Sequence, residues 1–210
     1  MKQIRPYRTL RNALISLDNG GRFFNFLTQA NDDKISLAEV GKVAGVFNDS
    51  QKMVLYLEMS LCELGELEMK KIRASLSTAL KNSYEAYLPK RYSPSEAIKN
   101  GSKSENAIIT GIPHFVTSKS DFSGFILIPL MIGTVVSMIM VPIIEQYDIY
   151  ELRDENSEET FIIAHAKRSR KFAPVKTRIG GIIKEFDVKE SGKGDKRNYI
   201  DTVFYTVLSS

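Results

Sequence analysis

Residues 100–112, NGSKSENAIITGI, mark the place where the character of this 210-residue chain changes. Before them, apolar residues recur at helical spacing, and from about Ala107 onward β-branched and aromatic residues alternate along the chain. The polar run Asn100–Ser104 between the two patterns is typical of a loop. The sequence therefore predicts an α+β fold, with a helical region over residues 1–100 packed with an antiparallel β region over residues 107–210. Aromatic and aliphatic residues in both halves allow the two regions to share one core.

Helix signals recur through the first half. Ser36 and Glu39 have the spacing of a capping box, in which each side chain accepts a hydrogen bond from the other residue's backbone amide. Ser93 and Glu96 repeat this pattern, and Pro94 stands at the preferred first position of a helix. With the apolar stripes between them, these signals predict four to six helices before residue 100.

Two β-hairpins are predicted in the second half. Gln146–Lys167 contains two alternating segments separated by an acidic turn. Arg178–Val188 and Asn198–Leu208 form a second pair, joined by a loop that contains glycine. Gly180 and Gly181 fall inside a predicted strand, where they favour a β-bulge or a close approach of another backbone.

A third feature of the second half is Phe122–Ile144, a run of 23 residues without a charged side chain. A run of about 20 apolar residues is long enough for a membrane helix. Ten of the 23 residues are β-branched, however, and Pro129 and Gly133 interrupt the run. The nearest charged neighbours are Asp121 and Glu145, so no basic residue anchors either end. We expect one or two buried strands, and a membrane segment and a buried helix remain as alternatives.

The composition excludes several classes of protein. Apolar content of 43% and charged content of 26% are those of a globular chain rather than a disordered one. The single cysteine, Cys62, excludes an internal disulfide, and no metal site or cofactor is predicted. The first residues carry charge but lack the apolar segment of a signal peptide, so we expect a cytoplasmic protein.

Positive charge is unevenly distributed along the chain, although the net charge is only +4. Two stretches are basic and free of acidic residues, the first near the start of the chain and the second after the first predicted hairpin: Arg5, Arg8 and Arg11, then Lys167, Arg168, Arg170, Lys171, Lys176 and Arg178. Such clusters attract anionic partners. Phe172 follows the densest part of the second stretch, where its ring could stack on a nucleic-acid base.

Two motif resemblances have simpler structural explanations. Asp32 and Glu39 occupy positions five and twelve of a calcium-binding EF-hand loop, but Thr28 replaces the first acid. Val40–Val46 followed by Asn48–Val54 resembles a helix-turn-helix, but its second helix offers almost no positive charge to phosphates. We expect a helix cap in the first case and an ordinary helical hairpin in the second.

The leading hypothesis is a non-enzymatic binding or assembly protein. It captures an anionic partner, with nucleic acid preferred, through the basic loop of the β half, and it forms a homo-oligomer. The alternative is a membrane-associated or self-assembling structural protein that uses Phe122–Ile144 as an anchor or interface. A third hypothesis is an enzyme of unidentified class near the junction of the two halves, where His114 or His165 would need a carboxylate partner.

Overall fold

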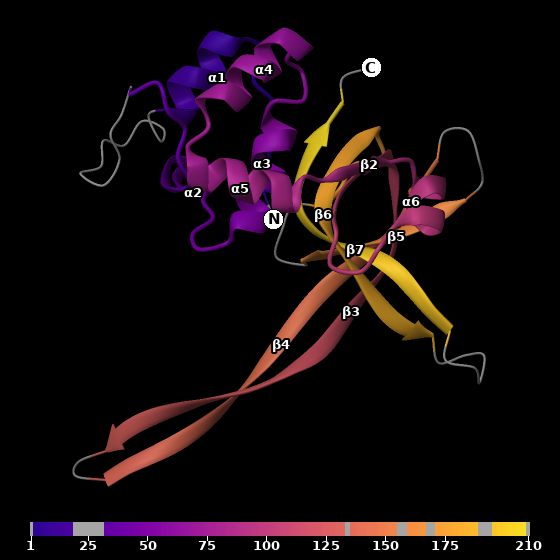
Figure 1. Cartoon of the computed structure of the whole chain (residues 1–210). Helices are drawn as coiled ribbons and strands as arrows, with labels where there is room; N and C mark the ends of the chain where they lie inside the picture. Colours follow the sequence, from indigo (N-terminus) through magenta and orange to yellow (C-terminus); the bar gives the residue numbers. More distant parts are fainter. Residues whose placement is uncertain are drawn as a thin grey trace.

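The computed structural model describes residues 2–18, 32–132, 135–154, 159–166, 171–188 and 195–208. Six helices and seven strands lie within these ranges (Figure 1). The helices lie before residue 101 and the long strands follow residue 105. The predicted α+β class is therefore confirmed.

Five helices form a bundle at the start of the chain. They are α1 (Leu10–Leu17), α2 (Leu37–Ala44), α3 (Ser50–Ser60), α4 (Glu66–Ser75) and α5 (Thr78–Tyr87). The capping box that begins α2 is formed, since the Glu39 carboxylate accepts from the Ser36 amide at 2.8 Å and the Ser36 hydroxyl accepts from the Glu39 amide. α6 (Pro94–Asn100) begins with the second capping box.

Helix α3 is the centre of the bundle. Every residue from Met53 to Ser60 is buried, so no face of this part of the helix is open to a DNA groove. The helix-turn-helix resemblance is therefore structural only, and α2 and α3 form the expected helical hairpin around Gly45, which has a left-handed backbone conformation.

The second half forms a barrel of five strands: β3 (Asn106–Ile132), β4 (Val135–Arg153), β5 (Thr160–Ala166), β6 (Thr177–Val188) and β7 (Asp195–Val207). The order is β3-β4-β5-β7-β6, and β6 pairs with β3 to close the barrel. Four of these pairings are antiparallel, and that between β5 and β7 is parallel. Two short strands of the first half, β1 (Lys2–Gln3) and β2 (Lys90–Tyr92), add parallel to β7 and β3. The sheet is thus mixed rather than wholly antiparallel as predicted.

Both predicted hairpins are confirmed by the register. Tyr147 pairs with Ala166 in the β4–β5 hairpin, and Thr177 pairs with Val207 in the β6–β7 hairpin. The register shifts between Gly180 and Gly181, as expected for a bulge. A Cβ at Gly180 would collide with Met59 of α3, so this glycine also lets the helix approach the barrel.

Beyond the barrel, β3 and β4 continue as a two-stranded arm that projects from the body (Figure 1). From Ser120↔Gln146 to Ile132↔Val135, no third strand among the described residues joins this pair. The apolar run Phe122–Ile144 forms the outer part of this arm. Two strands are therefore confirmed there, and the helix alternative is wrong. Among the described residues, no helix has the length and hydropathy needed to cross a membrane.

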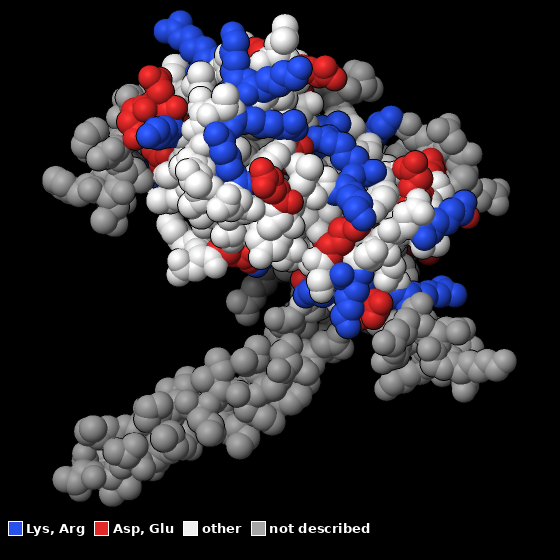
Figure 2. All heavy atoms as spheres, in the orientation of Figure 1, with Lys and Arg blue, Asp and Glu red and all other residues white. Residues whose placement is uncertain are grey.

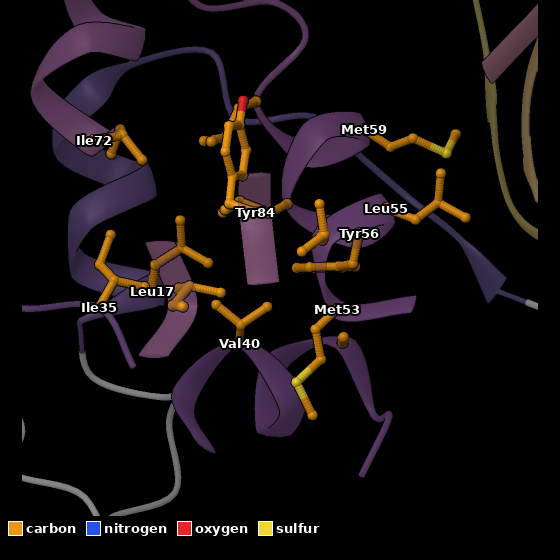
Figure 3. Packing of buried hydrophobic residues seen from close by; sticks show 14 of the residues in the cluster. Leu17, Ile35, Val40, Met53, Leu55, Tyr56, Met59, Ile72 and Tyr84 are labelled. Atoms are coloured by element: carbon orange, nitrogen blue, oxygen red, sulfur yellow. The ribbon is translucent and has the colours of Figure 1, made fainter. Parts of the chain in front are cut away.

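Two clusters of buried side chains form the core. The first lies inside the helical bundle and extends to Ile108 of β3 and Phe204 of β7. Figure 3 shows Leu55 and Met59 pointing from α3 towards the strands, and the ring of Tyr56 packs edge-on against Phe204 at 5.7 Å between centroids. The second cluster fills the barrel. The helical bundle and the barrel are thus in direct apolar contact.

Candidate anion-binding site between the helices and the barrel

Two arginines from opposite halves of the chain meet in one cleft. Arg91 and Arg178 line a cleft of about 260 Å³ together with Tyr92, Glu96, Ile108 and Thr110. Its walls come from β2, the first turn of α6, β3 and β6. The cleft therefore lies at the junction where the helical half meets the barrel.

Strand register explains why the two arginines meet. On one side of β3, Arg91 pairs with Ile108 in the parallel β2–β3 ladder. On the other side, Arg178 pairs with Thr110 in the antiparallel β3–β6 ladder. Ile108 and Thr110 are two residues apart, so they share one face of β3. This is the face turned to the helices, because Ile108 belongs to the helical core cluster.

Arg91 is held by a buried carboxylate. Glu58 of α3 is 4% exposed, and its Oε2 accepts a hydrogen bond from Arg91 Nη2 at 3.0 Å. The Tyr84 hydroxyl donates to Glu58 Oε1, and Arg73 Nη2 lies 3.7 Å from the same oxygen. Burial and the neighbouring carboxylate raise the pKa of Tyr84. Two guanidinium groups thus share one carboxylate, which leaves an excess positive charge beside the cleft.

Arg178 is oriented by Cys62. Its Nη1 donates to the Cys62 Sγ at 2.6 Å. Burial raises the pKa of this thiol, while the nearby Arg178 charge acts in the opposite direction. The thiol therefore stays protonated at neutral pH and positions Arg178 without cancelling its charge. Cys62 is half-buried, and a thiol whose pKa is raised by burial is a weak nucleophile at neutral pH.

Glu96 is the acidic residue lining the cleft, and its carboxylate serves the start of α6. Its Oε2 accepts from the Ser93 amide at 2.7 Å. A guanidinium group has five N–H donors, and Glu58 and Cys62 occupy few of those on the two arginines. The cleft thus presents spare donors of positive sign, together with the hydroxyl group of Thr110.

The surface around the helices is also basic. Figure 2 shows Lys and Arg side chains in an arc that crosses from the helical half towards the barrel, with a few acidic residues between them. Exposed basic residues follow one another along α4 and β2: Lys70, Lys71, Arg73, Lys90 and Arg91. In the sequence, Lys70, Lys71 and Arg73 form a short basic run and Lys90 is adjacent to Arg91, so a signal was present, although neither group was predicted to be part of a site.

The structure places the basic residues predicted from the sequence in different regions. Lys167, Arg168 and Arg170 lie outside the described residues. Lys171 is exposed, with its Nζ 5.0 Å from the centre of the Phe115 ring. Lys176 is exposed just before β6, whose second residue is Arg178 in the cleft.

The N-terminal arginines lie on the helical side. Arg5 is exposed and follows Ile4, whose amide donates to Tyr205 of β7 at 2.8 Å. Two residues further, the Tyr7 amide donates to Ser60 at the end of α3, close in sequence to Cys62. Arg5 thus lies on the segment that joins β7 to the end of α3. Arg8 and Arg11 are exposed at the start of α1.

Phe172 is packed into the barrel rather than exposed for stacking. It is 9% exposed, and its ring contacts Tyr150 and Tyr205 edge-on, with centroids 5.0 and 5.2 Å away. His165 packs on it at 4.6 Å. An aromatic residue after a basic run gives no sign in the sequence of which way it points, and Phe172 is not part of the site described here.

The two histidines lie opposite carboxylates in the β-sheet. His165 pairs with Asp148, and both are buried; His114 pairs with Glu151. Asp148 Oδ1 accepts from the Ser118 hydroxyl at 2.6 Å. His165 is fully buried inside the barrel cluster, so a substrate has no access to it.

The carboxylates of the EF-hand resemblance serve the backbone. Asp32 Oδ1 accepts from the Lys34 amide at 3.0 Å, and Glu39 caps α2. Thr28 lies outside the described residues. Within the described ranges, no cluster of three or more His, Cys, Asp or Glu side chains could hold a metal ion.

Comparison with known proteins adds no family to this description. No protein-family model matches the chain, and no curated protein sequence matches it. The fold and the cleft define an α+β protein in which a helical bundle covers a five-stranded barrel and arginines gather at the junction.

Proposed function

We propose that this protein binds nucleic acid through the basic surface at the junction of the helices and the barrel. The observation that carries the proposal is the cleft flanked by Arg91 and Arg178, whose guanidinium groups keep spare donors. The planar guanidinium group of arginine forms bidentate hydrogen bonds with two oxygens of a phosphate group. A cleft of about 260 Å³ accommodates one phosphate group, and the surrounding exposed basic residues extend the contact along a backbone.

The barrel itself gives secondary support. The barrel begins with a meander of β3, β4 and β5, and β5, its third strand, pairs in parallel with β7, its fifth. This connectivity is that of the OB-fold. Such barrels often bind oligonucleotides on the outer face of their second and third strands. Here those strands are β4 and β5, where Glu151 lines a second cleft and α6 packs on β5. Because folds host many functions, we place the binding on the basic junction rather than on this face.

The predicted basic loop extends the same proposal. Lys171 and Lys176 are exposed in the segment that leads into Arg178. A polyanion bound at the junction would be attracted by the charge of this segment as well, since fields of clustered charges act over about a Debye length of 8–10 Å. The proposed mechanism is thus electrostatic capture, with the cleft arginines as the specific anchors.

Fluorescence anisotropy with a labelled 20-nucleotide single strand, at a series of salt concentrations, tests this proposal. The variant Arg91→Gln with Arg178→Gln removes both charges but keeps an amide donor for Glu58 and Cys62. We expect the affinity to fall by about tenfold or more at low salt. The slope of the logarithm of the binding constant against the logarithm of the salt concentration should become shallower by about 1.4, because two phosphate contacts are lost.

The matched control removes two charges at the other end of α3. Lys52 pairs with Asp49 at 2.9 Å and Lys103 with Glu185 at 3.6 Å, so Lys52→Gln with Lys103→Gln likewise removes two charged side chains that have partners. This control should bind nearly as well as the unmodified chain. Absence of binding by the unmodified chain at 50 mM salt, or equal losses in the two double variants, would refute the proposed site.

A further inference from the structure

The arm is apolar on both of its faces. Successive residues of a strand face opposite sides, so the two faces of the arm carry alternate residues. From Phe125 to Ile132 both sets are apolar, and Val135–Ile144 continues the pattern, broken only by Ser137. In an arm with one solvent-exposed face and one buried face, polar and apolar residues would alternate along each strand. Both faces of this arm therefore need to be covered.

Both edges of the arm are also available. The described pairing of β3 with β6 ends at Gly111, and that of β4 with β5 begins at Tyr147. Along the apolar section, each of these two strands pairs only with the other among the strands that the structure describes. A lone two-stranded hairpin is at best marginally stable in water, and its open edges are templates for further strands.

At the base of the arm, Phe115 and Val116 lie at a β-bulge and are 51% and 50% exposed. The polar stretch Thr117–Asp121 separates them from the apolar section. The surface that needs to be covered is therefore the apolar section Phe122–Ile144.

Lipid would cover the two faces but not the two edges. Hydrocarbon provides no hydrogen-bond partners for backbone N–H and C=O groups, so an open hairpin is unstable within it. The residues that border the apolar section, Asp121 and Glu145, pair with each other in register and are both acidic. This acidic border would be repelled by an anionic membrane surface. Arms that pack against one another in water cover their faces, while water hydrogen-bonds the backbone groups of their edges.

The size of the arm sets the number of copies. Ten cross-strand pairs connect Phe122–Ile132 with Val135–Ile144, which corresponds to a length of about 33 Å at ~3.3 Å per residue. With strands ~4.8 Å apart, one face measures roughly 330 Å², so a single face-to-face contact buries only about 660 Å² in total. Stable interfaces bury about 1,200–2,000 Å². A pair of arms also leaves two apolar faces in water, so each arm needs at least two neighbours.

We propose that the arms of three or more copies of this chain pack together and form the core of a homo-oligomer. Each arm buries both faces against its neighbours, and the uncharged section allows identical arms to meet without repulsion. The bodies, each with its basic junction, lie around this core, so the assembly would present several polyanion sites at once. The oligomer does not depend on nucleic-acid binding, and the two proposals fail separately.

Size-exclusion chromatography with light scattering on the full chain in detergent-free buffer tests the assembly. The expected mass is at least three times the 23.7 kDa of one chain. Ile128 and Ile139 are paired in the middle of the arm, and Ile128→Glu with Ile139→Glu should reduce the mass to that of a monomer. The control Phe47→Glu with Leu67→Glu places two charges on exposed apolar residues of the helical half, 72% and 76% exposed, and should leave the mass unchanged.

A second variant guards against misfolding of the first. Joining Asp121 to Glu145 through an Asn-Gly turn removes the apolar section and preserves the hairpin register. This variant should be a monomer that melts in one transition. A monomeric or dimeric full chain, an unchanged mass in both arm variants, or a chain that floats with vesicles of phosphatidylcholine and phosphatidylglycerol and needs detergent to stay in solution would each overturn the proposal.

Discussion

Removing one hydroxyl group from the buried Glu58 cluster tests whether this cluster holds the junction together. Tyr84 is 8% exposed, and its hydroxyl donates to the Glu58 carboxylate, which is 4% exposed. The variant Tyr84→Phe keeps the ring and its packing, so it opens no large cavity. It removes one hydrogen bond to a charged acceptor, an interaction that contributes about 1.5–3 kcal/mol.

The other partners of Glu58 limit the loss. Arg91 and Arg73 stay within 3.0 and 3.7 Å of the carboxylate and are each about half exposed, with side-chain exposure of 50%. We therefore expect a decrease of about 2 kcal/mol in the free energy of unfolding, near the lower end of the range for a hydrogen bond to a charge. For a chain of this length that corresponds to a melting temperature lower by roughly 4–8 °C.

Urea denaturation followed by circular dichroism gives the free energy, and thermal melting gives the temperature. Tyr87→Phe on the same helix is the matched control, because Tyr87 is 41% exposed, and it should change stability by less than about 0.5 kcal/mol. Combining Tyr84→Phe with Arg91→Gln should give a non-additive effect, since both residues act on Glu58. Equal stability of the two phenylalanine variants would refute the idea that Glu58 organises this region.

Three further predictions follow from individual residues. Burial raises the pKa of Glu39, so the folded protein binds more protons than the unfolded chain, and the free energy of unfolding falls as the pH rises above the ordinary pKa of 4.5. Glu39→Gln keeps a capping side chain, and its melting temperature should exceed that of the unmodified chain by an amount that grows from pH 4 to pH 7. A difference in melting temperature that does not change with pH would contradict this cause. Gly181→Ala would press a methyl group against the Asp201 carbonyl oxygen and should lower the free energy of unfolding by about 1–3 kcal/mol. In the control Gly65→Ala, the nearest atom lies 3.9 Å from the added methyl group, so the decrease should be less than about 1 kcal/mol. Equal decreases in urea denaturation would show that the bulge tolerates a side chain. Replacing the four basic residues between Lys167 and Lys171 by Ala should abolish binding of the labelled single strand without lowering the melting temperature, and unchanged affinity would remove this loop from the proposed mechanism.

The elements of secondary structure could be predicted because their signals are local. A capping box involves residues three apart, and a strand facing the core alternates every second residue, so Ser36, Ser93 and the β4–β5 hairpin followed from short stretches. The bulge at Gly180-Gly181 was predictable for the same reason. The parallel pairing of β5 with β7 was not, because strands far apart in the chain can meet in either direction without any local sign.

The candidate site was predictable only in part. Arg178 belongs to the longer basic cluster, whereas Arg91 has only Lys90 beside it and enters the cleft because β2 adds to the free side of β3. Phe172 illustrates the opposite case, since its basic neighbours suggested exposure and the barrel core buries its ring.

The sequence by itself indicated the helical first half, the two β-hairpins of the second half, the clustering of positive charge, and a run of 23 residues without charge. These properties depend on residue type and near neighbours along the chain. The closure of the barrel, the meeting of Arg91 with Arg178 over β3, and the projection of the apolar run as an arm were decided only by the tertiary structure. They depend on contacts between residues far apart in sequence, where the burial of whole faces rather than local preference determines which strands pair.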